Sequence, residues 1–134
     1  GVEDFKVKDE WYFNMRFREG KEGVTSVLDA VPDDNARSGR SSWPRGPKKH
    51  IVEASGRAET LCWSVERKDG GRGVGFTGAH FHYNFGNDGF RKLVLNAVAW
   101  TAGLEIPKNG LVTHRPDEVE LDANQDFKKP EKKK

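Results

Sequence analysis

The stretch that decides the fold reads GRGVGFTGAHFHYNFGNDGFRKLVLNAVAWTAG, residues 71–103. Its second half predicts a helix over residues 88–102, because apolar side chains recur there at helical spacing. Asn87 or Asp88 can cap the start of this helix, and Gly103 suits the position just after its end. The positions that share the predicted buried face are Phe90, Leu93, Val94, Ala97, Val98 and Thr101.

The opposite side of the predicted helix is apolar as well. Leu95, Ala99 and Trp100 lie on that side, so the helix needs cover on two sides. The other elements expected from this chain supply less cover than that. We therefore expect a complementary N-terminal segment or a second copy of the chain to complete the packing. We also expect the isolated chain to lack a sharp, cooperative unfolding transition.

Strands are predicted upstream of the helix. Residues 59–67 alternate apolar and polar positions, and residues 72–79 read as a glycine-rich strand. The turn residues at 68–71 join these two strands in a hairpin. Residues 24–31 are short and β-branched, which is typical of another strand. Alternation and aromatic side chains between residues 5 and 17 predict one or two more at the start of the chain.

Two segments are too polar to join a core. Residues 32–50 hold three of the six prolines and, apart from Trp43, almost no apolar side chain. A polar loop of this length inside a domain is usually functional or disordered. Residues 128–134, KKPEKKK, read as a solvated basic tail.

Composition excludes several classes of protein. A chain of 134 residues has the size of one domain. Its 23 Lys and Arg nearly balance 21 Asp and Glu, for a net charge of +2, which argues against a nucleic-acid partner. No apolar run approaches the roughly 18 residues that a membrane span needs, and no leader-like start is visible. We expect a soluble protein, in a compartment that the sequence leaves open.

The best candidates for chemistry are His80 and His82. They fall between the predicted strand end and the helix start, where open α/β sheets bind ligands. On a continuing strand, positions i and i+2 point to one face, so both imidazoles could act as acid and base on a polar substrate. Asn84 adds hydrogen-bonding groups suited to sugar hydroxyls. A strand end that is merely rich in aromatics, without chemistry, is the alternative.

A metal site at His80 and His82 is a further alternative. Two histidines on one face can bind a metal, but a third ligand is needed for a convincing centre. Asp9, Glu10 or His50 could supply it. Apart from this possible metal, we expect no cofactor.

A second cluster reads Asp9-Glu10-Trp11-Tyr12. Two carboxylates beside two aromatic rings could hold a polyol, since an aromatic ring suits the apolar face of a sugar. A charged strand edge followed by core aromatics explains the same residues.

Arginine and cysteine are two further residue types that can take part in binding or catalysis. Arg72 could bind a carboxylate or phosphate, although surface exposure is the usual state of an arginine. The single cysteine, Cys62, lies in the middle of a predicted strand. We therefore expect a buried apolar residue there and not a nucleophile.

Residues 71–103 resemble the C-terminal part of the ThuA-like family of trehalose-utilisation proteins. The family has a glycine-arginine strand, a Thr-Gly…His end, and a helix with Phe-Arg…Leu-Leu-Asn-Ala…Trp. Asp9-Glu10 with Tyr12 is similar to the family's Asp-Glu-x-Tyr segment, and Trp63 to its strand tryptophan. The matching positions here are Gly71, Arg72, Thr77, Gly78, His80, Phe90, Arg91, Leu93, Leu95, Asn96, Ala97 and Trp100. Either His80 or His82 is the counterpart of the family histidine, because counting from Phe90 and from Thr77 gives different positions.

The resemblance implies an α/β fold: the C-terminal part of a flavodoxin-like, class I glutamine-amidotransferase-like three-layer domain with a mixed sheet. Residues 1–110 would form that portion, and residues 111–134 a C-terminal extension. The family domain is about twice as long as the matched region, so we expect the N-terminal strands and helices of that domain to be missing from these 134 residues. A glutaminase is not expected, because an elbow cysteine and a His-x-Glu motif are missing.

The function implied by the resemblance is the processing of trehalose or a related keto-disaccharide by an enzyme or half of one. His80 or His82 would transfer the proton, assisted by Asp9 or Glu10. Trp11, Tyr12, Asn84 and Arg72 are the expected ligand-binding residues. The alternative is a non-catalytic module that binds a sugar or another small polar ligand and keeps only the fold.

Overall fold

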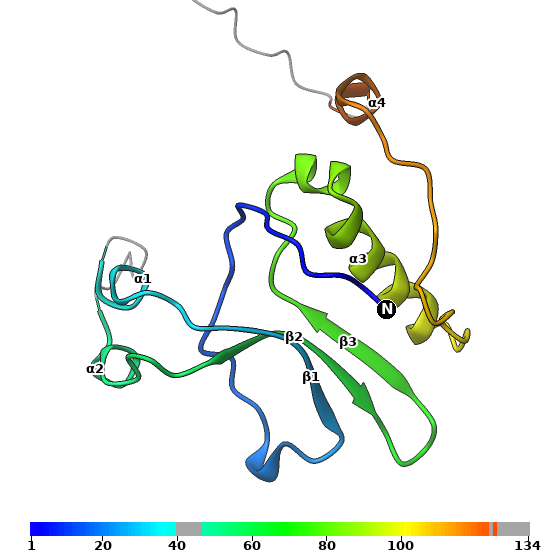
Figure 1. Ribbon diagram of the computed structural model, residues 1–134. Coiled ribbons are helices and arrows are strands. Elements are labelled where there is room, and N and C mark those ends of the chain that lie inside the picture. The colour runs from blue at the N-terminus through cyan, green and yellow to red at the C-terminus, as the bar shows by residue number, and fades with distance from the viewer. Residues whose placement is uncertain (40–46, 124, 126–134) are drawn as a thin grey trace, which may run out of the picture. The chain divides into compact units, whose positions relative to one another are not determined.

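The computed structural model describes residues 1–39, 47–123 and 125 (Figure 1). The predicted basic tail, residues 128–134, lies outside this part of the chain, as does the centre of the predicted polar loop. No helix within the described residues is both long enough and apolar enough to cross a membrane.

The described chain divides into two compact units. The first unit comprises Gly1–Asp9 together with Ala79–Lys134, and the second comprises Glu10–Gly78. The sheet belongs to the second unit and the main helix to the first. Each is described within its own unit.

The second unit is built on a three-stranded sheet. Its strands are β1 (Val24–Ala30), β2 (Glu59–Glu66) and β3 (Arg72–Phe76), in the order β1-β2-β3 (Figure 1). Both neighbouring pairs are antiparallel; Ser64, for example, lies opposite Val74. The sheet and the helices of the first unit together confirm the α/β class.

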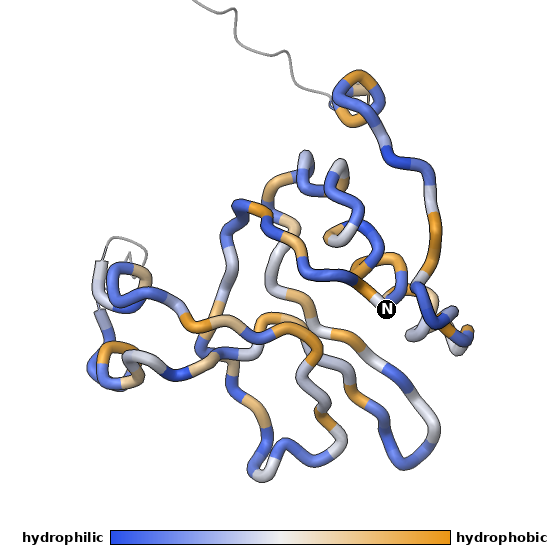
Figure 2. The backbone as a smooth tube through the Cα atoms, viewed as in Figure 1, coloured by the Kyte–Doolittle hydropathy of each residue, from blue (hydrophilic) through white to orange (hydrophobic). Residues whose placement is uncertain are grey.

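The hairpin predicted from the turn residues is confirmed. Gly70 adopts a left-handed φ of +85°, and the backbone N–H of Arg67 donates to the carbonyl of Gly71 at 2.8 Å. The turn is hydrophilic, in contrast to the more apolar strands that it joins (Figure 2). The expected mixed sheet differs from the one observed. Among the described strands both pairings are antiparallel. For β2 and β3 this follows from the tight turn that connects them.

The prediction of strands in the opening segment is wrong. Residues 1–18 contain no strand, and Asn14 has a left-handed φ of 63°, which interrupts an extended backbone. The aromatic side chains instead pack singly, edge to face. In the second unit the Trp11 ring contacts Phe76 at a centroid distance of 5.6 Å, and Phe17 contacts Trp63 at 5.1 Å.

The predicted polar loop, residues 32–50, contains helical turns at its described ends. These are α1 (Asp34–Ser38), capped by the side chain of Asp33, and the start of α2 (Lys49–Val52). A 3₁₀ turn, η1 (Glu19–Lys21), precedes β1. The core of this unit lies on β2, where the side chains of Leu61 and Cys62 are buried.

The main helix of the first unit, α3 (Asp88–Thr101), matches the predicted element closely. The Asn87 side chain accepts a hydrogen bond from the backbone N–H of Phe90 at 3.0 Å, and Gly103 follows the helix with φ +86°. Both predicted ends are thus confirmed by their capping residues.

The predicted buried face of α3 is confirmed only in part. Phe90 and Leu93 are buried, but Val98 is 63% exposed, while Ala99, assigned to the opposite side, is buried. At the helix start, burial comes from Phe90, which packs against Phe5 and Phe85 with ring centroids at 6.2 and 5.5 Å.

Candidate functional site

The segment between β3 and α3, residues 77–87, is called the histidine loop here. The predicted strand 72–79 ends earlier, at Phe76, so His80 and His82 do not extend a strand as expected. Ala79 instead takes a left-handed φ of +74°, and His82 begins a 3₁₀ helix, η3 (His82–Gly86). The placement of both histidines on one strand face is therefore wrong.

Asp9 holds the histidine loop by its carboxylate. Its Oδ2 accepts from the backbone N–H of Ala79 at 2.8 Å, and its Oδ1 accepts from those of His80 and Phe81 at 3.0 and 3.2 Å. Successive N–H groups that converge on one anion form a concave anion-binding site, and hydrogen bonds to a charged acceptor are stronger than neutral ones. The loop conformation is thus set by a residue about 70 positions earlier in the sequence.

Asn84 completes this arrangement. Its Nδ2 donates to Asp9 Oδ2 at 2.9 Å and to the carbonyl of Lys8 at 3.0 Å. Both carboxylate oxygens of Asp9 therefore have at least two donors each. The structure brings the candidate residues Asp9, His80 and Asn84 together, a grouping that the sequence could not show, and Asp9 and Asn84 hold the loop. Their expected roles in catalysis and ligand binding stay predictions.

The side chains that the loop carries differ in exposure. His80 is exposed and contacts the ring of Phe81 edge to face at 5.1 Å. Phe81 and Tyr83 are 38% and 47% exposed, a large fraction for aromatic side chains. His80 and Phe81 thus form an imidazole and aromatic surface on the first unit, and Tyr83 is a further exposed ring of the same loop.

His82 lies partly buried beside this surface. Its Nε2 is 3.2 Å from the carbonyl oxygen of Leu121. A carbonyl oxygen only accepts hydrogen bonds, so Nε2 carries the proton, and in the neutral ring Nδ1 is the nitrogen with the free lone pair. No sequence pattern indicates this partner, because Leu121 is 39 residues away in the predicted C-terminal extension.

The other predicted site residues, Glu10, Trp11, Tyr12 and Arg72, belong to the second unit. The Tyr12 hydroxyl donates to Glu10 at 3.2 Å, and this hydrogen bond, with the charge of Glu10, raises the pKa of Tyr12. Arg72 forms an ion pair with Glu66 at 3.8 Å. The Trp11 ring packs on the backbone of Gly78, where an added Cβ would lie 2.7 Å from the ring. The predicted site residues are thus divided between two units.

The metal alternative finds no third ligand in the described part of the chain. No group of three or more His, Cys, Asp or Glu side chains is placed there to hold a metal ion. The carboxylate of Asp9 is engaged with backbone N–H groups. His50 Nε2 lies 3.5 Å from Asn14 Nδ2, in the second unit.

Cys62 is an inert residue, as the sequence predicted. Its side chain is only 1% exposed, and burial raises the pKa of the thiol to about 11. A thiol in that state is almost entirely protonated at neutral pH and is a poor nucleophile.

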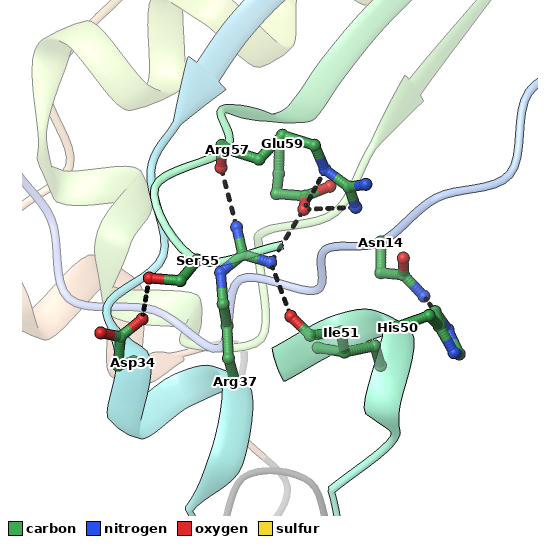
Figure 3. A network of polar contacts seen from close by, with 8 residues as sticks. All are labelled: Asn14, Asp34, Arg37, His50, Ile51, Ser55, Arg57 and Glu59. Carbon is green, nitrogen blue, oxygen red and sulfur yellow. Dashed lines mark hydrogen bonds and ion pairs between the residues drawn. The ribbon is translucent and has the colours of Figure 1, made fainter. Parts of the chain in front are cut away.

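The second unit contains a buried ionic network that was not predicted from the sequence (Figure 3). Arg37 is 1% exposed and donates to Glu59 Oε1 at 3.0 Å and to the carbonyl of Arg57 at 2.7 Å. The Arg57 side chain donates to the same Glu59 oxygen at 2.9 and 3.1 Å. Phe13 lies 5.4 Å from the Arg37 guanidinium. The network joins α1 to β2.

Glu59 stays ionised in this network. Burial raises its pKa, but hydrogen bonds from Arg57 and Arg37 and the charges of both guanidinium groups outweigh burial, so the pKa lies below its usual value. No local pattern pointed to this network, because Arg37 sits in a polar run and Glu59 at the start of a strand. Its groups contact one another and the backbone, which is the behaviour of a structural element.

Comparison of the chain with protein-family models, with curated proteins and with solved structures finds no match. The resemblance of residues 71–103 to ThuA-like proteins therefore rests on the sequence motifs alone.

Proposed function

We propose that this chain is part of a ThuA-like sugar-processing protein and that the histidine loop is its ligand site. We also propose that the sheet and α3 form the C-terminal part of a flavodoxin-like domain. The observation that carries it is the contact of Asp9 with three successive backbone N–H groups, at 2.8–3.2 Å.

The contact with Asp9 supports a functional loop because it maintains an unfavourable backbone conformation. A left-handed φ at a residue with a side chain, as at Ala79, costs about 1–3 kcal/mol and persists only where other contacts over-determine it. Such residues cluster at binding and catalytic sites. Here the conformation leaves His80 and Phe81 exposed.

The chemistry of the loop suits a polyol. The exposed faces of Phe81 and Tyr83 can pack on the apolar face of a sugar ring, and imidazole nitrogens can bond its hydroxyls. His80, or His82 through Nδ1, would take a proton from a sugar hydroxyl in the transition state. Asp9 would act as a positioning residue.

A non-catalytic carbohydrate-binding module is the second candidate. It is favoured by the saturation of the Asp9 carboxylate with hydrogen-bond donors. A carboxylate so engaged is a poor proton acceptor. A sugar would then bind to the aromatic surface without reaction.

Both candidates are tested by binding and turnover of trehalose and a 3-keto-glucoside with the full chain. Single variants His80→Ala and His82→Ala are compared with His50→Ala, a histidine of the second unit. If one histidine transfers a proton, its variant loses roughly 10²–10⁴-fold in rate, while His50→Ala is unchanged. Sugar binding without turnover in the unmodified chain supports the module. Binding and turnover that are equal in all three variants would contradict both candidates.

A further inference from the structure

The C-terminal segment of the first unit returns to the histidine loop. We call residues 111–123 the C-terminal strap (orange to brown in Figure 1). Its start is fixed to α3 by two contacts: the backbone N–H of Leu111 donates to Asn96 Oδ1 at 2.8 Å, and Arg91 Nε donates to Thr113 Oγ1 at 3.0 Å. Arg91 also donates to the carbonyl of Phe85, at 2.9 Å, so it joins the strap to the loop.

The end of the strap, helix α4 (Glu118–Ala123), contacts η3. Leu121 is only 7% exposed, and its Cδ1 would lie 3.4 Å from a Cβ added at Gly86. The Leu121 carbonyl accepts from His82 Nε2, and the Tyr83 hydroxyl donates to Asp122 Oδ1 at 2.9 Å. Two side chains of the candidate site are thus engaged by the strap.

The helix of the strap is short and depends on its own capping contacts. Asp117 Oδ1 accepts from the backbone N–H of Glu120 at 2.9 Å, and Glu120 Oε2 accepts from that of Asp117 at 3.0 Å, a reciprocal cap. His114 Nε2 lies 2.8 Å from the same Glu120 oxygen. An isolated helix of six residues is not stable in water, so α4 forms only with these caps and while docked on η3.

We propose that the C-terminal strap is a detachable cover for His82 and for the hydroxyl of Tyr83. When the strap is docked, His82 Nε2 is held by Leu121. When the strap is released, both ring nitrogens of His82 become accessible. If the proposed function holds, release of the strap also opens this side of the site to a sugar. The change in accessibility of His82 does not depend on the proposed function.

The test is the rate at which diethyl pyrocarbonate acylates each histidine of the full chain, located by peptide mass spectrometry. The exposed His80 provides an internal reference in the same loop. In Leu121→Asp a charge replaces the buried anchor, and we expect His82 to react roughly tenfold faster relative to His80, the effect of losing a few weak anchoring contacts. The matched control is Val119→Asp, on the same helix but 77% exposed, which should leave the ratio unchanged.

Tyr83→Phe is a milder variant that removes the hydrogen bond to Asp122 and keeps the Leu121 anchor, and it should raise the His82 rate by a smaller factor. Circular dichroism checks that α3 remains folded in every variant. Equal His82 acylation rates in the unmodified chain, Leu121→Asp and Tyr83→Phe would contradict the proposal that the strap covers His82. If the rates change as expected but trehalose and the 3-keto-glucoside bind to no variant, the proposed function fails and the cover stands.

Discussion

The indole ring of Trp63 lies over Gly75 of the neighbouring strand, where no side chain fits. The two residues are opposite partners in the β2–β3 ladder, and a Cβ added at Gly75 would overlap the ring. The same ring packs on Phe17. The glycine at position 75 of β3 is thus explained by a tryptophan within the same unit, with no ligand required.

The first prediction concerns this contact. Gly75→Ala should destabilise the chain by about 1–3 kcal/mol, because overpacking forces the indole out of its position. Gly73→Ala is the matched control on the same strand, since nothing lies within 4 Å of its added Cβ. Urea denaturation measures both variants. Equal free energies of unfolding for the two would contradict the packing described.

The second prediction concerns Asp9. Asp9→Ala removes the acceptor of three backbone N–H groups, so the amides of residues 79–81 should exchange with solvent at least roughly tenfold faster. Hydrogen exchange followed by NMR measures this directly. Asp4→Ala, an exposed carboxylate in the same segment, should change nothing. Added formate should restore part of the protection in Asp9→Ala by occupying the vacated oxygen positions. Unchanged exchange in Asp9→Ala would show that the loop is held by other contacts.

The features that could be predicted from the sequence are those that depend on residues close together in the chain. The start and end of α3 follow from Asn87 and Gly103, and the β2–β3 hairpin follows from alternation around the Gly70 turn. These features are encoded within a few residues, by helical period, capping and turn conformation.

What the sequence could not predict depends on contacts between distant residues. The role of Asp9 is set by N–H groups 70–72 positions away, and the partner of His82 is 39 positions away. The opening segment read as strands because aromatic alternation is the same whether the rings line a sheet or pack singly. For Asp9 and His82, the sequence pattern identified the candidate residue, but only the structure shows which residues contact it.

The third prediction concerns Cys62. With the thiol pKa raised from 9.0 to about 11, the fraction of thiolate at pH 8 is lower by about 100-fold than for an ordinary cysteine. Alkylation by iodoacetamide should therefore be slower than in the unfolded chain by at least this factor, and 8 M urea should abolish the protection. Mass spectrometry of the alkylated fraction over time gives the rates. Native alkylation as fast as in urea would contradict the burial of this side chain.

The last prediction concerns the pH dependence that Glu59 confers. Because its pKa is lower in the folded chain than in the unfolded one, the ionised carboxylate contributes stability at pH values above the unfolded pKa. That contribution declines as the pH falls below about 4.5, the usual pKa of a glutamate, and is lost once the pH has passed through the lower, folded pKa.

Glu59→Gln tests this contribution. At pH 7 the variant should be less stable by about 3–5 kcal/mol, because it leaves the buried guanidinium of Arg37 without its charge partner. The difference from the unmodified chain should shrink below pH 4. Protonation then removes the charge of Glu59 in the unmodified chain, as the substitution does at every pH. Glu66→Gln, near the exposed end of the same strand, is the matched control and should cost less than about 1 kcal/mol. Urea denaturation between pH 3 and 7 measures all three chains. A difference between Glu59→Gln and the unmodified chain that stays constant over this range would contradict the lowered pKa.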